Sequence, residues 1–245
     1  NIKLVLVGDD NQLPSVGPGQ VLKDLINSKK ITTIKLNLLY RQKDDSYINI
    51  LAEEIRNNNL SSNFTDKRSD YLFCECQSSS IKPTITDLCE KIKKKGYNYK
   101  QVQVMAPMYA TVVGIDALNV TLQSVFNPPD KSKKELQYGD VIFRENDKIL
   151  QLVNMPDDNV FKSGKNEIVV DYDGNVVTFE PKDFNNFKHG FIISIHKSQG
   201  SEFEIVIMPI SNLYHRMLYK KLIYTGITRA KRKLILIGDS SAFTY

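Results

Sequence analysis

The chain has 245 residues, of which 41% are hydrophobic and 25% charged, and it carries a formal net charge of +5 with an isoelectric point near 8.9. These values are typical of a soluble globular protein with one large or two small domains, and they exclude collagen-like and low-complexity chains. The apolar runs are too short for a transmembrane helix, which needs about 20 residues. The mild basicity permits a polyanionic partner, although a lysine-rich surface explains it equally well.

Cysteine usage points away from disulfides and metals. Three cysteines without a recognisable signal peptide favour a reducing cytoplasm. Cys74 and Cys76 have the spacing of a metal-binding pair, but no second pair follows and the histidines are distant. The period of two instead places both thiols on one face of a strand, where cysteine behaves as a small apolar residue. We therefore expect no metal site.

The first element is a near-continuous apolar run at residues 2–7, ending in Gly8-Asp9-Asp10. Such a run predicts a parallel strand buried on both faces, with polar groups at the edge where open α/β sheets bind ligands. The chain begins with Asn1 and not with Met. A core strand directly after such a start indicates a segment of a longer protein.

Helical spacing of apolar residues follows further along the chain. It occurs at residues 20–26, 46–57, 83–95 and 115–125. In the third of these segments, Pro83 and Gly96 suit the first and last turns. A short strand is predicted at residues 102–105.

From residue 138 to residue 189 the pattern changes to short β-like pieces. These lie at residues 141–143, 149–153, 168–172 and 176–179. Asp173-Gly174 between the last two is a strong hairpin signal. The pattern predicts a small all-β barrel inserted in an α/β domain. The α/β part resumes with strands at residues 191–195, 204–210 and 233–237 and a helix at residues 222–230.

Two polar clusters near the N-terminus could serve phosphate chemistry. In residues 8–15, the Gln12 amide can donate and accept hydrogen bonds, so it can orient water or contact a terminal phosphate. A polar turn is the alternative. In residues 38–42, Arg41 follows an apolar strand and can fork onto phosphate oxygens. A surface ion pair is the alternative there.

A third cluster, residues 195–203, places a dense run of polar and small residues between two buried strands. This density of donors suits a phosphate or nucleic-acid backbone, and Gly200 allows close approach of a ligand to the main chain. His196 taken alone is more often structural than catalytic.

The fourth cluster, residues 222–231, carries Arg229 near the end of a predicted helix. An arginine there can enter a neighbouring nucleotide site and neutralise charge on the γ-phosphate, an effect worth about 10³–10⁵ in rate. Completion of a helix C-terminus by cations is the alternative for Lys231 and Arg232.

In this order, the four clusters resemble the RecD-type branch of superfamily 1 DNA helicases, which includes the exodeoxyribonuclease V alpha subunit and its longer stand-alone relatives. Nearly the whole chain takes part in the resemblance. Residues 8–25, 38–42, 196–203 and 224–231 look like helicase motifs III, IV, V and VI, and residues 104–129 look like the entry to the second motor domain.

The resemblance implies an α/β fold, namely the second RecA-like motor domain of a P-loop NTPase, with an inserted small all-β SH3-like subdomain bordering the single-strand path. It divides the chain into the end of the first motor domain at residues 1–30, the first part of the second at residues 31–137, the inserted subdomain at residues 138–190, and the remainder of the second at residues 191–245.

Roles for individual residues follow from the same resemblance. Gln12 would couple the γ-phosphate to DNA, and Arg41 and Arg229 would contact that phosphate. The nucleotide would be bordered by Gly8, Asp9, Gln199, Gly200, Glu202 and Thr228. DNA would be faced by Pro107, Asn119, His196, Lys197 and Ser198.

Family members use ATP and Mg²⁺ and move 5′ to 3′ on single-stranded DNA. The resemblance thus implies these ligands, a cytoplasmic location, and no membrane partner. It names single-stranded DNA, the N-terminal motor domain of the same protein, and recombination or repair subunits as candidate partners. Two features depart from the family. First, the chain lacks a Gly-x-x-x-x-Gly-Lys-Thr phosphate loop and an acidic pair for Mg²⁺, and we expect both upstream of Asn1. Second, the stretch at residues 161–165 is shorter than the family pattern.

The sequence predicts the C-terminal portion of an ATP-dependent 5′–3′ DNA helicase or translocase. This portion would supply one wall of the ATP site, with an arginine finger, and part of the DNA path. By itself it is expected to be inactive. The alternative is a non-catalytic half-motor that binds DNA or a partner. A nuclease rests on the family's historical name alone, because the sequence has no acidic metal cluster of the nuclease type.

Overall fold

A five-stranded parallel sheet forms the centre of the protein in a computed structural model, which describes residues 3–14, 17–36, 46–152 and 167–243. The strand order is β1-β11-β10-β2-β9, and each neighbouring pair is parallel. The strands are β1 (Tyr71–Glu75), β2 (Val102–Ala106), β9 (Ile192–Ser194), β10 (Phe203–Ile210) and β11 (Ala230–Gly238). The predicted α/β fold is confirmed.

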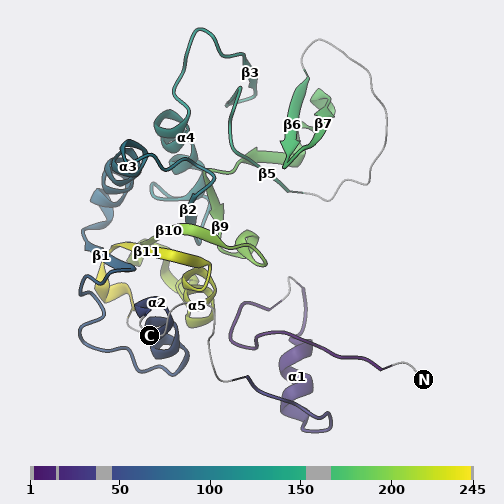
Figure 1. Cartoon of the computed structure of the whole chain (residues 1–245), viewed down its shortest axis with the longest axis vertical. Helices are drawn as coiled ribbons and strands as arrows, with labels where there is room; N and C mark the ends of the chain where they lie inside the picture. The colour runs from purple at the N-terminus through teal and green to yellow at the C-terminus, as the bar shows by residue number, and fades with distance from the viewer. Residues whose placement is uncertain (1–2, 15–16, 37–45, 153–166, 244–245) are drawn as a thin grey trace.

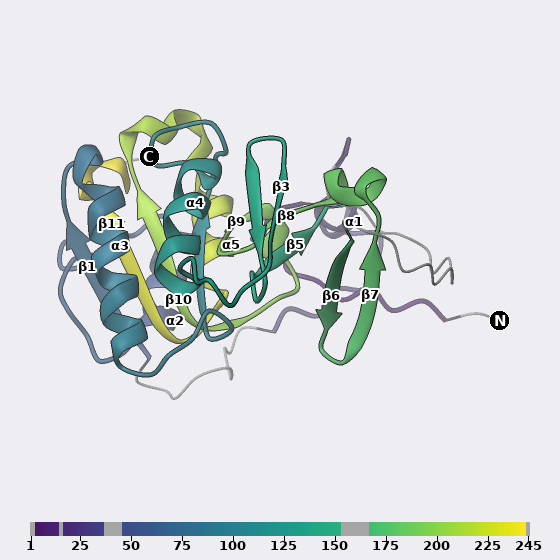
Figure 2. The ribbon, with the colours of Figure 1, turned by 90° about the horizontal axis from the view of Figure 1, so that it is seen from above.

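Helices cover both faces of this sheet (Figures 1 and 2). One face carries α3 (Ser78–Lys94) and α4 (Ile115–Phe126), and the other carries α2 (Tyr47–Arg56) and α5 (Lys220–Ile227). Because both faces are covered, the central strands are apolar where they are buried, at residues 205–210 of β10 and 234–237 of β11. None of the described helices has the length and hydropathy needed to cross a bilayer.

The helices follow the predicted apolar spacing, but α3 begins earlier than predicted. In α2, Ile48, Leu51 and Ile55 are buried on one stripe, as expected. By contrast, α3 begins at Ser78 and carries Pro83 inside it. Buried Ile81 lies one turn before Ile85 and extends the apolar stripe past Pro83, so packing continues the helix. Proline removes one helical hydrogen bond, to the carbonyl of residue 79, and that residue is exposed to water.

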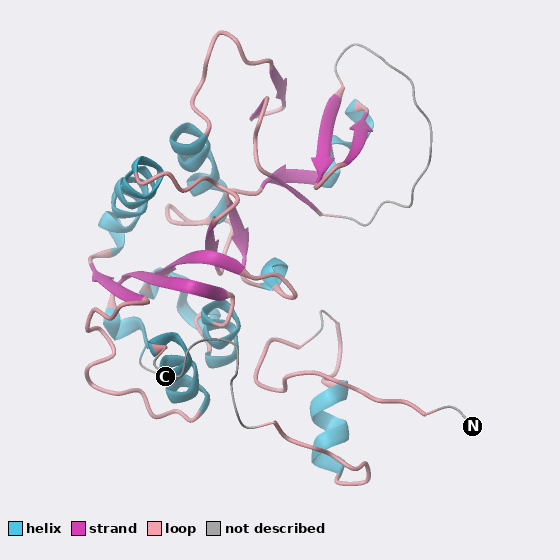
Figure 3. Cartoon of the chain, in the orientation of Figure 1, coloured by secondary structure: helices cyan, strands magenta, loops and turns pink. Residues whose placement is uncertain are grey.

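The predicted strand at residues 2–7 is wrong for the residues that the structure describes. Residues 3–8 form no strand, and the side chains of Leu4 and Val7 are 79% and 92% exposed. A strand needs a neighbour to pair its backbone groups, and the sheet offers none to this segment. Residues 3–8 lie beside the helix α1 (Val21–Ser28), apart from the sheet (Figure 3). We call the described residues up to position 36 the N-terminal segment.

The residues after α4 form the inserted all-β part. Its strands are β3 (Glu135–Tyr138), β4 (Val141–Arg144), β5 (Ile149–Gln151), β6 (Ile168–Tyr172), β7 (Asn175–Phe179) and β8 (Phe187–His189). They form three antiparallel pairs, β3-β4, β5-β8 and β6-β7, around a small core rich in phenylalanine. Asp173 and Gly174 have φ of 51° and 99°, which confirms the predicted hairpin. The described strands pair two by two and do not close a hydrogen-bonded barrel.

Asp147 is the first of two buried polar links between this β part and the sheet. Its carboxylate accepts hydrogen bonds from Gln123 of α4 at 2.6 Å, from Asn127 at 2.7 Å, and from His189 of β8 at 3.1 Å. Burial raises the pKa of Asp147, but the hydrogen bonds from His189, Asn127 and the Arg144 backbone outweigh it and hold the pKa below its usual value. The carboxylate therefore stays charged and keeps these elements together.

Lys148 is the second link. Its ammonium group donates to the Tyr99 carbonyl and to Gln103 Oε1, both at 2.8 Å, and lies 5.8 Å from the centre of the Phe203 ring. Gln103 in turn donates to the carbonyls of Gly190 and Phe191 at 3.2 Å. Burial lowers the pKa of Lys148 to about 8. A cation held by neutral oxygens thus joins the β part to strand β2.

Replacing Lys148 with methionine should change how stability depends on pH. An unfolded lysine has a pKa of about 10.4, so between about pH 8 and pH 10.4 the unfolded chain holds a proton that the folded protein has released. The wild-type free energy of unfolding should gain up to about 1.4 kcal/mol per pH unit over this range, relative to Lys148→Met. Urea unfolding at several pH values measures this difference. Lys94→Met, at an exposed site, is the control, and a flat difference for Lys148→Met would contradict the prediction.

Candidate functional site

Three of the four polar clusters meet in the folded chain at the backbone of Leu13. The Leu13 N–H donates to Thr225 Oγ1 of α5 at 2.9 Å, and the Leu13 carbonyl accepts from Gln199 Nε2 at 2.8 Å. In addition, the Tyr224 hydroxyl donates to Asp9 Oδ2 at 3.2 Å. These contacts join residues about 200 positions apart. We call the group formed by Asp9, Gln12, Leu13, Gln199, Tyr224 and Thr225 the junction.

Asp9 organises the turn that carries Gln12. One carboxylate oxygen of Asp9 accepts the Asn11 N–H at 2.9 Å, which makes an Asx turn. The other oxygen accepts from Gln12 Nε2 at 3.1 Å as well as from the Tyr224 hydroxyl. The Gln12 amide is therefore oriented through a carboxylate that α5 also contacts.

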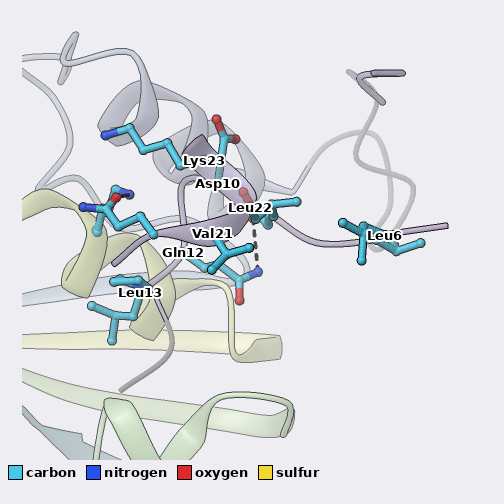
Figure 4. A pocket seen from close by; sticks show the side chains of 12 residues that line it. Leu6, Asp10, Gln12, Leu13, Val21, Leu22 and Lys23 are labelled. Carbon is cyan, nitrogen blue, oxygen red and sulfur yellow. Dashed lines mark hydrogen bonds between the residues drawn. The ribbon is translucent and has the colours of Figure 1, made fainter. Parts of the chain in front are cut away.

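Gln12 lies on the wall of a pocket of about 330 Å³ (Figure 4). The wall combines apolar side chains with Asp9, Asp10, Lys23 and Lys221. Lys221 comes from α5, whereas the remaining lining residues belong to the N-terminal segment. The two lysines and the two aspartates balance in formal charge, and the Gln12 amide donates to one of these carboxylates. Because the pocket lies between two parts of the chain, its shape depends on how they dock.

Arg229 does not lie on the predicted helix. The helix α5 ends at Ile227, and Arg229 precedes the first residue of β11. The side chain is buried, with 3% exposed. Its guanidinium donates to the Thr225 carbonyl at 3.1 Å, the Ser201 carbonyl at 3.2 Å and Thr228 Oγ1 at 3.1 Å. In this structure it ties the end of α5 to the loop after Gly200.

Gly200 is the clearest backbone feature among the predicted nucleotide-binding residues. It has φ of +80°, where other residues are strained, and nothing lies within 4 Å of the position that a Cβ would occupy. Glu202 forms a 3.5 Å ion pair with Lys231, and Thr228 donates to the Thr225 carbonyl. Gly8 is exposed beside Leu22.

Three of the predicted DNA-facing residues are buried in this structure. Pro107 follows β2 inside the protein. Asn119 exchanges two hydrogen bonds with the backbone of Ile192, at 3.0 and 2.9 Å, and so fastens α4 to β9. Ser198 has no exposed surface, and its hydroxyl donates to the Ile195 carbonyl. Side chains engaged in this way are poorly placed for direct contact with DNA.

The other two predicted DNA-facing residues reach the surface. His196 is half-buried, and Lys197 is exposed, with its ammonium group 3.1 Å from the Leu152 carbonyl. Arg41 and the second polar cluster lie outside the described residues.

Cys74 lies in β1, Cys76 follows the end of that strand, and Cys89 is buried in α3. Cys74 and Cys76 are partly buried against the core, and burial raises the pKa of both thiols. The described residues contain no group of three or more histidine, cysteine or acidic side chains that could hold a metal ion.

Sequence reasoning gave no role to Tyr224 and Thr225. Both are polar, and both sit in the helical stretch Leu222–Ile227, where every residue is buried. A buried polar side chain needs a hydrogen-bond partner. This requirement is the signal in the sequence that points to Tyr224 and Thr225, although it does not identify partners so distant along the chain.

Three family models match the chain in succession. The AAA domain matches residues 1–71, the SH3 domain of ATP-dependent RecD-like DNA helicases matches residues 118–164, and the UvrD-like helicase C-terminal domain matches residues 189–237. The ATP-dependent RecD2 DNA helicase of Deinococcus radiodurans is 30% identical over 246 residues, which cover 98% of this chain and 33% of that protein. The chain belongs to the RecD-like helicases.

Two further matches also cover most of this chain. The RecBCD enzyme subunit RecD of Buchnera aphidicola is 26% identical to the RecD-like chain over 304 residues, covering 99% of the chain and 50% of that subunit. The chain thus spans between a third and a half of these two relatives. A Pif1 helicase from Bacteroides, solved with ADP-AlF3 and single-stranded DNA, matches with a TM-score of 0.43 at 16% identity, over 94% of this chain and 60% of that one.

Replacing Thr225 with valine in the RecD-like chain should loosen the docking of the N-terminal segment. The change keeps the side-chain shape but leaves the Leu13 N–H without its acceptor, at a cost of about 1–2 kcal/mol. Hydrogen exchange at the Leu13 amide should become about tenfold faster. Thr86→Val on α3 is the matched control, because Thr86, like Thr225, donates to the carbonyl four residues earlier. Equal effects of the two variants would refute a specific role for Thr225.

Proposed function

We propose that this RecD-like chain is part of an ATP-driven motor, a helicase or translocase that moves 5′ to 3′ on single-stranded DNA. The junction carries the proposal, since Leu13 and Asp9 on either side of Gln12 contact the two segments that resemble helicase motifs V and VI. The relatives are named as helicases, which supports the reaction class. The chain would supply one wall of the ATP site and part of the DNA path.

The residues present fit one wall of an ATP site. The open backbone at Gly200 and the Gln12 amide would meet a phosphate group, and Lys23 and Lys221 would offset the carboxylates of Asp9 and Asp10 in the same pocket. They do not form a set of Mg²⁺ ligands among the described residues. We therefore infer that the phosphate loop and the metal ligands belong to another part of the full protein. ATP with Mg²⁺ would supply the hydrolysable phosphoanhydride.

In this proposal the chain's own residues orient the reacting groups and neutralise the charge on the γ-phosphate. Gln12 would hold the attacking water or the terminal phosphate, and Gly8, Asp9, Gln199, Gly200, Glu202 and Thr228 would border the nucleotide. Arg229 would contact the γ-phosphate, with Arg41 in support. To do so, Arg229 must exchange its neutral oxygen acceptors for phosphate oxygens, which are stronger acceptors because they are charged.

The proposed partners follow from the same division of the chain. Residues 1–30 would complete the first motor domain, residues 31–137 and 191–245 would form the second, and residues 138–190 would be the inserted SH3-like subdomain. Single-stranded DNA would pass near His196 and Lys197, which reach the surface. The protein would act in the cytoplasm, with recombination or repair subunits as further candidate partners.

A second candidate is a non-catalytic half-motor that binds DNA or a partner protein. The burial of Arg229 favours it, because a guanidinium used on backbone carbonyls can serve structure alone.

Arg229→Ala in the full-length protein distinguishes the two candidates. If Arg229 is a finger, ATP hydrolysis should fall by about 10³-fold or more while ATP binding is largely kept. Because Arg229 is buried, the melting temperature and ATP affinity are measured on the same samples. Arg232→Ala, at an exposed ion pair with Glu204, is the control. A loss of hydrolysis below about tenfold would assign Arg229 to structure.

The 245 residues alone should not hydrolyse ATP. They carry no phosphate loop, so the β- and γ-phosphates lack their main cradle. The measurement compares phosphate release by this chain and by the full-length protein, each with and without single-stranded DNA. Robust ATP turnover by the 245-residue chain would overturn the proposal that it supplies only one wall of the ATP site.

A further inference from the structure

The junction holds the Gln12 segment by two separate kinds of contact. Thr225 and Gln199 bind the backbone of Leu13 on its two sides, so they fix where the segment lies. Tyr224 instead donates from its hydroxyl to the Asp9 side-chain carboxylate. The position of the segment and the orientation of its side chains are therefore set by different residues of the third and fourth clusters.

The same oxygen of Asp9 receives both the Tyr224 hydroxyl at 3.2 Å and the Gln12 amide nitrogen at 3.1 Å. The second Asp9 oxygen is held by the Asn11 N–H at 2.9 Å. With both oxygens anchored, the carboxylate plane is fixed. An amide that donates to a fixed carboxylate has its own orientation restricted as well, because hydrogen bonds weaken steeply away from linearity.

Tyr224 is a rigid anchor for this arrangement. Its side chain is 4% exposed and belongs to the helix α5, which packs on the sheet next to α2. Burial, together with the charge of Asp9, raises the pKa of Tyr224 to about 12, so the hydroxyl stays a proton donor at neutral pH. Charge-assisted hydrogen bonds of this type are roughly twice as strong as neutral ones.

We propose that Tyr224 and Asp9 are positioning residues that orient the Gln12 amide toward the nucleotide, through a relay from α5 to the carboxylate to the amide. The inference rests on the proposed function for its catalytic meaning. When the N-terminal segment is docked on α5, the relay is complete and Gln12 is fixed. When the segment separates from α5, Asp9 loses its Tyr224 donor and Gln12 loses a fixed anchor. Tyr224 thus couples the orientation of the Gln12 amide to the docking of the N-terminal segment on α5.

Tyr224→Phe in the full-length protein tests the relay, because it removes one hydroxyl and keeps the ring. The kcat of ATP hydrolysis with oligothymidylate present should fall about tenfold or more, while the KM for ATP changes less than about twofold. Tyr219→Phe, at the start of the same helix and 39% exposed, is the matched control and should leave both parameters unchanged. An unchanged kcat for Tyr224→Phe, or a loss confined to KM, would overturn the relay.

A double-mutant cycle separates the relay from a general loss of stability. If Tyr224 acts through Gln12, adding Tyr224→Phe to Gln12→Ala should lower kcat by less than about twofold further. Independent losses that multiply would contradict the proposal. Asp9→Asn should reproduce the kcat loss of Tyr224→Phe.

A structural readout keeps the relay testable if the motor proposal itself fails. Wild-type protein without DNA-stimulated ATP hydrolysis would refute the motor. The relay would still predict that Tyr224→Phe shifts the side-chain amide resonance of Gln12 in ¹⁵N-glutamine-labelled protein, whereas Tyr219→Phe would not. An unmoved Gln12 resonance would refute the relay whatever the activity.

Discussion

The docking of Leu13 holds the N-terminal part of this chain to the rest. Among the described residues before position 46, Leu13 is the one buried side chain, and its N–H and carbonyl are both bound by residues about 200 positions away. The helix α1 buries none of its residues. The buried Leu13 side chain and the two hydrogen bonds of its backbone therefore determine where Gln12 and its pocket lie. Such an attachment is specific, yet weak enough to be reversible.

The attachment of the β part follows the same physical logic. Buried Asp147 and Lys148 join it to α4 and β2 through hydrogen bonds, whereas the sheet itself is held by apolar packing. A polar contact keeps its geometry only while every donor and acceptor is paired, so these links specify orientation more than they add stability. The molecule thus combines a rigid sheet with two polar joints, which suits a motor whose parts move relative to one another.

In the proposed motor, Arg229 must leave its present hydrogen-bond partners before it can contact a phosphate. Its guanidinium is satisfied inside the chain by Thr225, Ser201 and Thr228. Thr225 also binds Leu13, so the same helix turn holds the arginine and the Gln12 segment. Any movement of this helix turn that frees the arginine for a phosphate would therefore also change the contacts of Thr225 at the junction. This shared turn links charge neutralisation to docking in the proposed cycle.

The sequence by itself determined the elements whose pattern is local. The apolar runs of β10 and β11, the stripe of α2 and the Asp173-Gly174 hairpin all appear as expected, and ordered motifs were enough to identify the RecD-like family. These features succeed because burial period and turn geometry are written in neighbouring residues.

Only the tertiary structure decided which polar groups are available. It left residues 3–8 without a strand partner, placed Pro83 inside a helix, buried Asn119 and Ser198, and paired Tyr224 with Asp9. The physical reason is that a hydrogen-bond partner can lie anywhere along the chain. Residue types and spacing show that a polar side chain needs a partner, but the fold alone determines which partner it meets.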